Sequence, residues 1–250
     1  MATVVASAAD RKVSERKFYS RMALLLVALV LLGFGPSFYL RGIVPAYPRP
    51  NPTLSPAVIF HGLVFSTWML LIVAQTQLIA ARKHSTHMQL GKAGMLFAIL
   101  MIPVMYLTAV WQVARANQPP FTDPLTWTIV PLATIIPFAV LVWNGWQKRR
   151  DVQTHKRLML CAAILVMMGP TIGRLPIAPP SVVGFTVQML VGFLLFVPLV
   201  IWDRKTIGQV HPATKFGIGM AALWVIFPLA VFWLNLPWAK VAAYLPGVGA

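Results

Sequence analysis

Cysteine and acidic residues are scarce in this chain. The single cysteine among 250 residues, Cys161, excludes an internal disulfide and a cysteine-cluster metal site. Only 5 residues are Asp or Glu, and by sequence all of them lie in tails or loops between apolar runs. Ion- and proton-coupled transporters usually carry a carboxylate within a span, so this distribution argues against that class. A di-iron carboxylate bundle, which needs several inward glutamates, is excluded.

Charge of either sign is also limited, at 10% of residues, whereas 58% are hydrophobic. A soluble domain carries about 25% charged residues. The formal net charge of +16 would indicate a nucleic-acid partner in a soluble protein. Here, however, the basic residues fall between long apolar runs, which is typical of integral membrane proteins. We therefore expect an all-α integral membrane protein that contacts a lipid bilayer and binds no nucleic acid.

Seven runs reach or approach the roughly 20 apolar residues that a membrane-spanning helix needs. The sequence therefore predicts a seven-helix transmembrane domain at 22–236, a basic cytoplasmic tail at 1–21 and a short external tail at 237–250. The predicted spans are Met22–Leu40, Ala57–Ala81, Ala93–Ala114, Leu125–Trp146, Leu158–Gly173, Val182–Trp202 and Phe216–Leu236.

The basic residues predict the orientation of the bundle. Sixteen of the 21 Lys and Arg residues lie in the N-terminal tail and in the loops on its side of the membrane, and 5 lie on the other side. Cytoplasmic loops are enriched in Lys and Arg. We therefore expect a cytoplasmic N-terminus and, after seven spans, an external C-terminus. The external loops at 45–52, 117–120 and 175–180 are rich in proline and are expected to be extended.

Three histidines share one setting on the predicted cytoplasmic side. His87, His155 and His211 each precede an apolar run that leads outward. Imidazole ligates zinc, copper or haem iron, so the three are candidate metal ligands if their helices are neighbours. Asp151 or Asp203 would then orient a ligand through its second ring N–H. The alternative is that each histidine simply places a polar ring at the membrane interface.

A polar stripe runs along the second predicted span. His61, Trp68, Gln75 and Arg82 are spaced by seven residues, which places them on one helical face. Such a face is expected to point into the bundle, where these residues would line a cavity and bind a cofactor or small molecule, or bond to neighbouring helices. Methionines at similar depth are candidate companions of His61 in an outer iron or copper site, and the alternative is that they only pack in the core; they are Met105, Met167, Met168 and Met189.

Three strings resemble those of an uncharacterised family of bacterial multi-pass inner-membrane proteins, and the resemblance covers most of the second to fifth spans. The resemblance implies a bacterial inner-membrane location and no particular activity. A weaker likeness is to b-type cytochromes, although His61 has no histidine partner for a second haem. The strings are His61-Gly62 with Trp68 and Gln75, His87 with Leu90-Gly91, and His155-Lys156-Arg157-Leu158-Met159.

Three functions remain open at this point. The first is a redox or metal-dependent membrane protein that holds haem b, zinc or copper through the cytoplasmic-side histidines. The second is a non-enzymatic transporter, sensor or membrane-complex subunit with a small-molecule ligand or a membrane-protein partner, in which the stripe lines a cavity. The third is a zinc-dependent membrane hydrolase, although such seven-helix enzymes usually have two histidines four residues apart on the last helix, which this chain lacks.

Overall fold

The structure is a computed structural model, and it describes residues 8–45, 51 and 53–249. Within these residues it is helical, and seven helical segments are long and apolar enough to cross a membrane, as the sequence predicts. The elements are α1 (Ala8–Phe34), the π-helical turn η1 (Gly35–Tyr39), α2 (Pro56–Ala80), α3 (His84–Arg115), α4 (Pro124–Trp127), α5 (Ile129–Gln147), α6 (Val152–Ile172), α7 (Val182–Phe193), the 3-10 turn η2 (Leu194–Phe196), α8 (Val197–Ile207), α9 (Pro212–Trp233) and α10 (Trp238–Ala242).

Several helices begin well before the apolar runs that predict them. Helix α1 already starts at Ala8, so much of the predicted tail at 1–21 is helical, and Tyr19 within it is buried. Helices α6 and α9 gain polar first turns because their N-cap side chains accept backbone N–H groups. The Asp151 carboxylate accepts those of Gln153 and Thr154, and a ring nitrogen of His211 caps α9.

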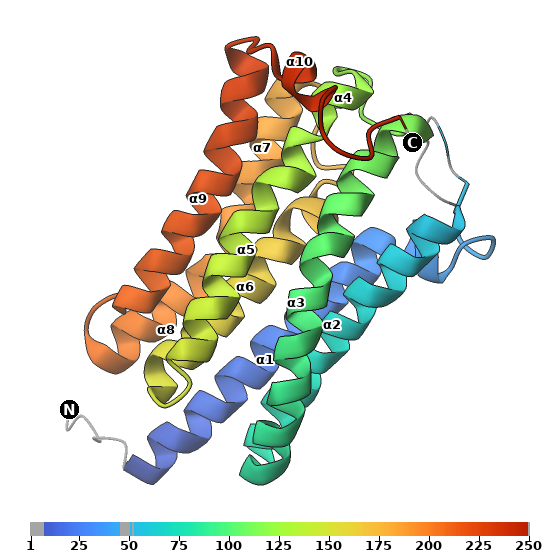
Figure 1. The fold of residues 1–250 in the computed structure, drawn as a ribbon. Helices are drawn as coiled ribbons and strands as arrows, with labels where there is room; N and C mark the ends of the chain where they lie inside the picture. Colours follow the sequence, from blue (N-terminus) through green and yellow to red (C-terminus); the bar gives the residue numbers. More distant parts are fainter. Residues whose placement is uncertain (1–7, 46–50, 52, 250) are drawn as a thin grey trace.

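Helix α6 is the central helix of the bundle. Of its most apolar 18-residue window 78% is buried, compared with at most 39% in the other six spans. It packs against α1, α5, α7 and α9. Helix α2 lies between α1 and α3, and α3 packs against α5 on its other side (Figure 1). Small residues allow these close contacts: a Cβ atom added at Gly217 of α9 would meet Cys161 of α6.

The sixth span is interrupted in its middle. Helix α7 passes into η2 and then α8, and Pro198 lies at the second residue of α8. Proline has no backbone N–H and crowds the carbonyl four residues earlier, so the regular helical pattern is broken at this point. The span therefore consists of two short helices, of which α8 carries the buried Asp203.

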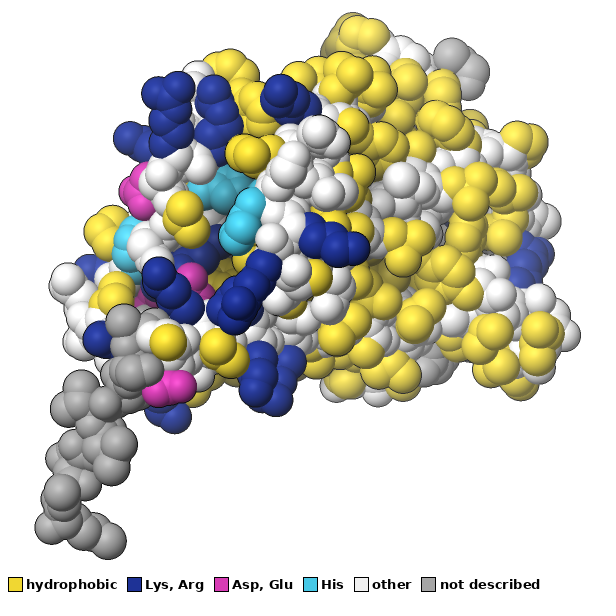
Figure 2. All heavy atoms as spheres, turned by 90° about the horizontal axis from the view of Figure 1, so that it is seen from below, with side chains coloured by type: hydrophobic (Ala, Val, Ile, Leu, Met, Phe, Trp, Pro, Cys, Tyr) yellow, Lys and Arg dark blue, Asp and Glu magenta, His cyan; other side chains and the backbone are white. Residues whose placement is uncertain are grey.

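The two ends of the bundle differ in chemistry. At one end, which we name the basic end, α1 begins and the α2–α3, α5–α6 and α8–α9 connections lie (Figure 1). Figure 2 views the molecule from this side, and Lys, Arg and His side chains gather on one part of the face beside extensive hydrophobic surface. The opposite end, which we name the proline end, carries the loops at 117–123 and 173–181 together with α4 and α10.

Candidate functional site

A cavity of about 600 Å³ lies at the proline end and extends into the middle of the bundle. Every helix except α8 and α10 contributes to its wall, and residues of the loops at 117–121 and 173–180 also line it. Hydrogen bonds hold these segments to the helices: the Gln188 side chain donates to the Leu175 carbonyl in the second loop, and the Gln112 side chain donates to the carbonyl of Pro124, where α4 begins after the first loop. The proline-rich segments thus help to build the chamber.

His61 of α2 lines this cavity with one ring nitrogen already engaged. Its Nδ1 lies 3.1 Å from Oγ1 of Thr108 on α3, and the same hydroxyl donates to the Val104 carbonyl at 2.7 Å. Because the hydroxyl proton is used there, Thr108 must accept from Nδ1–H of His61. The Nε2 atom of His61 therefore carries a lone pair, and the described residues give it no hydrogen-bond donor.

The charged groups of the cavity wall are all basic. Arg41, Arg115 and Arg174 line it, at or just beyond the ends of η1, α3 and α6. No Asp or Glu among the described residues lines it, and the remaining residues of the chain include none. The closest acid in sequence to these loops, Asp123, uses its carboxylate to cap α4 by accepting the Leu125 and Thr126 N–H groups.

The deeper wall of the cavity is apolar. It is formed by side chains from the middle of α2, α3, α6, α7 and α9: Met69, Met105, Met167, Met189 and Trp224. Three of the four methionines predicted as companions of His61 therefore share its cavity, whereas Met168 is not among the lining residues and packs at Gly192. The cavity thus joins a basic rim to a methionine-rich and aromatic interior.

The remaining residues of the predicted stripe lie in three different settings. Trp68 is 1% exposed and packs edge-to-face on Phe138 of α5. The Gln75 amide, oriented to satisfy its hydrogen bonds, donates to Nδ1 of His87 on α3 at 2.6 Å. Arg82 lies beyond the end of α2, with a backbone φ of 60°, and is exposed. Trp68 and Gln75 therefore face other helices, as His61 does through Thr108, whereas Arg82 does not. Of the four residues only His61 lines the cavity.

Two of the three candidate metal ligands are neighbours at the basic end. The rings of His87 and His155 lie 6.5 Å apart between centroids. Nδ1 of His155 is 2.8 Å from the Gly145 carbonyl, so it carries the proton. Nδ1 of His87 accepts from Gln75, so its proton lies on Nε2. The pair therefore presents one bare nitrogen, on His155.

His211 is engaged differently. Its Nδ1 accepts the Ala213 N–H and caps α9, and its own backbone N–H donates to Asp203. Burial, with a smaller contribution from nearby Arg157, lowers the pKa of His211. Among the described residues, no group of three or more His, Cys, Asp or Glu side chains is placed to hold a metal ion.

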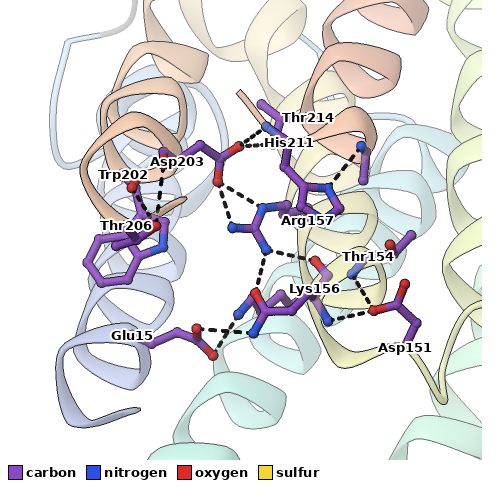
Figure 3. Close-up of polar contacts among 12 residues, drawn as sticks. Glu15, Asp151, Thr154, Lys156, Arg157, Trp202, Asp203, Thr206, His211 and Thr214 are labelled. Atoms are coloured by element: carbon purple, nitrogen blue, oxygen red, sulfur yellow. Dashed lines mark hydrogen bonds and ion pairs between the residues drawn. The ribbon is translucent and has the colours of Figure 1, made fainter. Parts of the chain in front are cut away.

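A buried ion pair lies next to His211 at the basic end (Figure 3). Asp203 of α8 is 0% exposed and Arg157 of α6 is 1% exposed. Nε and Nη2 of Arg157 lie 2.8 and 2.7 Å from Oδ1 of Asp203. The other carboxylate oxygen accepts the Thr214 hydroxyl at 2.6 Å and the His211 N–H at 3.0 Å.

The expectation that no span contains a carboxylate is therefore wrong: Asp10 and Glu15 lie within the candidate spanning segment Ala9–Tyr39, and Asp203 lies within the sixth. Helix α8 continues beyond its apolar run and carries this residue into the packed end of the bundle, within the spanning segment Val182–Ile207. The charge is tolerated there because Arg157 neutralises it and four donors saturate its oxygens. The sequence clue was an arginine and an aspartate flanking two different apolar runs.

The same cluster attaches the N-terminal helix to the centre of the bundle. Glu15 of α1 forms an ion pair of 2.6 Å with Lys156 of α6, and the Gln153 side chain donates to Glu15 at 3.4 Å. Gln153 also accepts from Nη1 of Arg157 through its backbone and side-chain oxygens. Together with the bonds of Asp203 to Arg157 and Thr214, these contacts connect α1, α6, α8 and α9 as one polar clamp; Figure 3 shows Glu15, Lys156, Arg157, Asp203 and Thr214 in it.

Comparisons with protein-family models, curated proteins and solved structures find no match for this chain.

Proposed function

We propose that the chain is a multi-pass membrane protein that binds a small molecule in the cavity at the proline end, as a transporter or sensor does. The observation that carries this proposal is the cavity of about 600 Å³ itself. All seven spans line it, although only the first part of the sixth span, α7, does so. Ligand pockets in proteins typically measure about 300–1,000 Å³ and combine apolar walls with a few polar groups. The lining described above has this composition.

Orientation belongs to the same proposal. The excess of Lys and Arg at the basic end favours a cytoplasmic location for that end. The cavity would then open toward the external side. Reporter fusions after Lys92 and after Lys215 should indicate cytoplasm, and a fusion after Ala250 should indicate the exterior. A cytoplasmic C-terminus would contradict this arrangement.

A second candidate is a haem or copper protein with its group in the same cavity. His61 supports this candidate because its Nδ1–H is fixed by Thr108 and its Nε2 carries a free lone pair, as in metal-bound histidines. Met105, Met167 and Met189 line the same space, and thioethers are ligands for haem iron and copper. A metal held by His87, His155 and His211 has less support, because the described residues form no group of three such ligands.

Dye binding tests the small-molecule proposal. Nile red, a neutral environment-sensitive dye, should bind saturably to the protein in lipid nanodiscs. Thr134→Trp should abolish this binding because Thr134 lines the cavity and is 8% exposed. The matched control is Ile136→Trp on the same helix, where the side chain is 73% exposed. Equal binding by both variants would refute a ligand site in the cavity.

Colour and metal content test the second candidate. The protein purified from its native host membrane should show a Soret band or stoichiometric copper, and His61→Ala should remove either signal while the protein remains folded. The control is His84→Ala, since His84 is exposed at the basic end. A colourless, metal-free preparation that still binds Nile red would contradict the haem or copper candidate and support the small-molecule proposal.

A further inference from the structure

We infer that the cavity selects an amphipathic anion, whose charged head group contacts Arg174 and Arg115 and whose apolar body extends along the methionines. This inference rests on the proposed function and adds the chemical class of the ligand. It starts from the distribution of charge over the whole molecule, because the cavity wall contains three arginines and no carboxylate among the described residues.

The acidic residues are placed far from this wall by the fold. Asp10, Glu15, Asp151 and Asp203 belong to the basic end, where α1 and α6 begin and α8 ends. Asp123, the remaining acid, caps α4 and does not line the cavity. No Asp or Glu side chain of the described residues therefore lines the wall beside these arginines. In a partly dehydrated space a bound anion would be attracted strongly, since the effective dielectric constant is lower than in water.

The bonding of Arg115 leaves part of its guanidinium for a ligand. Its Nη2 donates to the backbone carbonyls of Asn51 and Thr53. Its Nε is buried and has no hydrogen-bond partner among the described residues. Buried donors are usually paired, and an unpaired one is a reason to look for a missing acceptor. An oxygen of a carboxylate or phosphate head group would be such an acceptor.

Arg174 is held in a fixed position at the same rim. Its guanidinium carbon lies 3.9 Å from the centre of the Phe34 ring, and Nη1 donates to the Pro170 carbonyl at 2.6 Å. These contacts hold the side chain against the cavity wall that it lines. A planar guanidinium presents several N–H groups in fixed directions, which suits carboxylate and phosphate oxygens. Arg174 therefore supplies a preorganised positive charge.

The cavity is also polarised along the bundle. Arg115 and Arg174 lie at or just beyond the ends of α3 and α6, whereas Met69, Met105 and Trp224 come from the middle of their helices. A ligand with an anionic head and an apolar body would match both regions at once. His61 also lines the cavity, and its Nε2 is a hydrogen-bond acceptor. An acceptor does not bind an anionic oxygen, so the head group is expected at the arginines and not at His61.

Equilibrium binding of three radiolabelled probes tests the inference in nanodiscs of neutral lipid. Laurate and dodecyl phosphate carry anionic heads, and dodecanol has the same chain without charge. Wild type should bind both anions about tenfold or more tightly than dodecanol, because an anionic head group accepts charge-assisted hydrogen bonds from the arginines that the neutral alcohol cannot replace. Preference for one anion identifies the head group as carboxylate or phosphate.

Variants assign the selectivity to the arginine. Arg174→Gln should reduce anion binding about tenfold and leave dodecanol binding unchanged. Arg174→Lys should retain most of the selectivity because it keeps the charge. Arg150→Gln, at an exposed position of the basic end, is the matched control and should behave as wild type. Circular dichroism confirms that each variant is folded.

The outcomes separate the two proposals. Equal binding of all three probes by wild type, abolished by Thr134→Trp, overturns the anion inference and leaves the proposed function intact. Selectivity that survives Arg174→Gln overturns the assignment to that arginine. No saturable binding of dodecanol, the anions or Nile red overturns the proposed function, and the inference falls with it.

Discussion

Removal of the Asp203 carboxylate is the most informative perturbation of this fold. In Asp203→Ala, Nε and Nη2 of Arg157 lose their only acceptors among the described residues, while Nη1 keeps its bonds to Gln153. The Thr214 hydroxyl and the His211 N–H lose an acceptor as well. Because Arg157 is 1% exposed, water cannot replace the missing partner without opening the clamp.

The magnitude follows from this geometry. Breaking a buried ion pair by deleting one partner costs about 3–5 kcal/mol. Replacing both partners in Arg157→Met with Asp203→Ala removes the uncompensated charge, and the remaining cost comes from Thr214 and His211, at about 1–3 kcal/mol for each donor that stays unsatisfied. The double variant should therefore lose less unfolding free energy than the two single variants lose together, and the difference, the coupling energy, should be several kcal/mol.

Thermal unfolding in detergent measures this coupling. At a fixed scan rate the apparent melting temperature of Asp203→Ala should fall by about 10 °C, given about 2–4 °C per kcal/mol for a chain of this size. Glu15→Gln, which affects the partly exposed pair with Lys156 and the long hydrogen bond from Gln153, should lower it far less. Additive losses in the double variant, or an Asp203→Ala protein as stable as wild type, would refute the reasoning.

Three further variants test other parts of the structure. His211→Asn keeps an N-cap acceptor for α9 that does not titrate. Because burial lowers the pKa of His211, wild type should lose stability as pH falls below about 6.5. Thermal scans from pH 8 to pH 5 should therefore show a smaller loss of stability in the variant than in wild type. Asp151→Ala removes the cap of α6, so its melting temperature should fall at neutral pH and approach that of wild type in acid, since hydrogen bonds from Thr154 hold the Asp151 pKa low; an unchanged difference in acid would contradict this. Gly169→Ala should lower the melting temperature, because a Cβ there would lie 2.5 Å from the Trp224 ring, whereas Gly219→Ala, with open space around it, should be neutral or stabilising; equal effects would show that the ring yields.

Spans are predictable because they depend on local composition. A run of about 20 apolar residues has few alternatives to a helix in a membrane, so the number and order of the seven segments agree with the structure. The helix starts are less predictable. The polar first turns of α6 and α9 depend on cap contacts of Asp151 and His211 that follow from local geometry, not from hydropathy.

The candidate site was predictable only in part. Spacing by seven residues identified one face of α2, and three of its four residues do face other helices. It could not tell that His61 alone would line the cavity, because this depends on which helix lies opposite each residue. By sequence Arg174 is one of five basic residues outside the basic end, and nothing distinguishes it from the others. Its place in the cavity wall depends on the packing of the end of α6 near α1, where its guanidinium contacts Phe34.

The sequence by itself determined the helical class of this protein, its seven segments long and apolar enough to cross a membrane and the unequal charge of its two ends, because these depend on composition along the chain. The tertiary structure decided which charges meet. Arg157 and Asp203 are 46 residues apart, and they form one buried pair because α6 is central and α8 packs beside it. The arginines at the ends of α3 and α6 share a cavity for the same reason: distance in space, which sets every electrostatic energy, is fixed only when the helices pack.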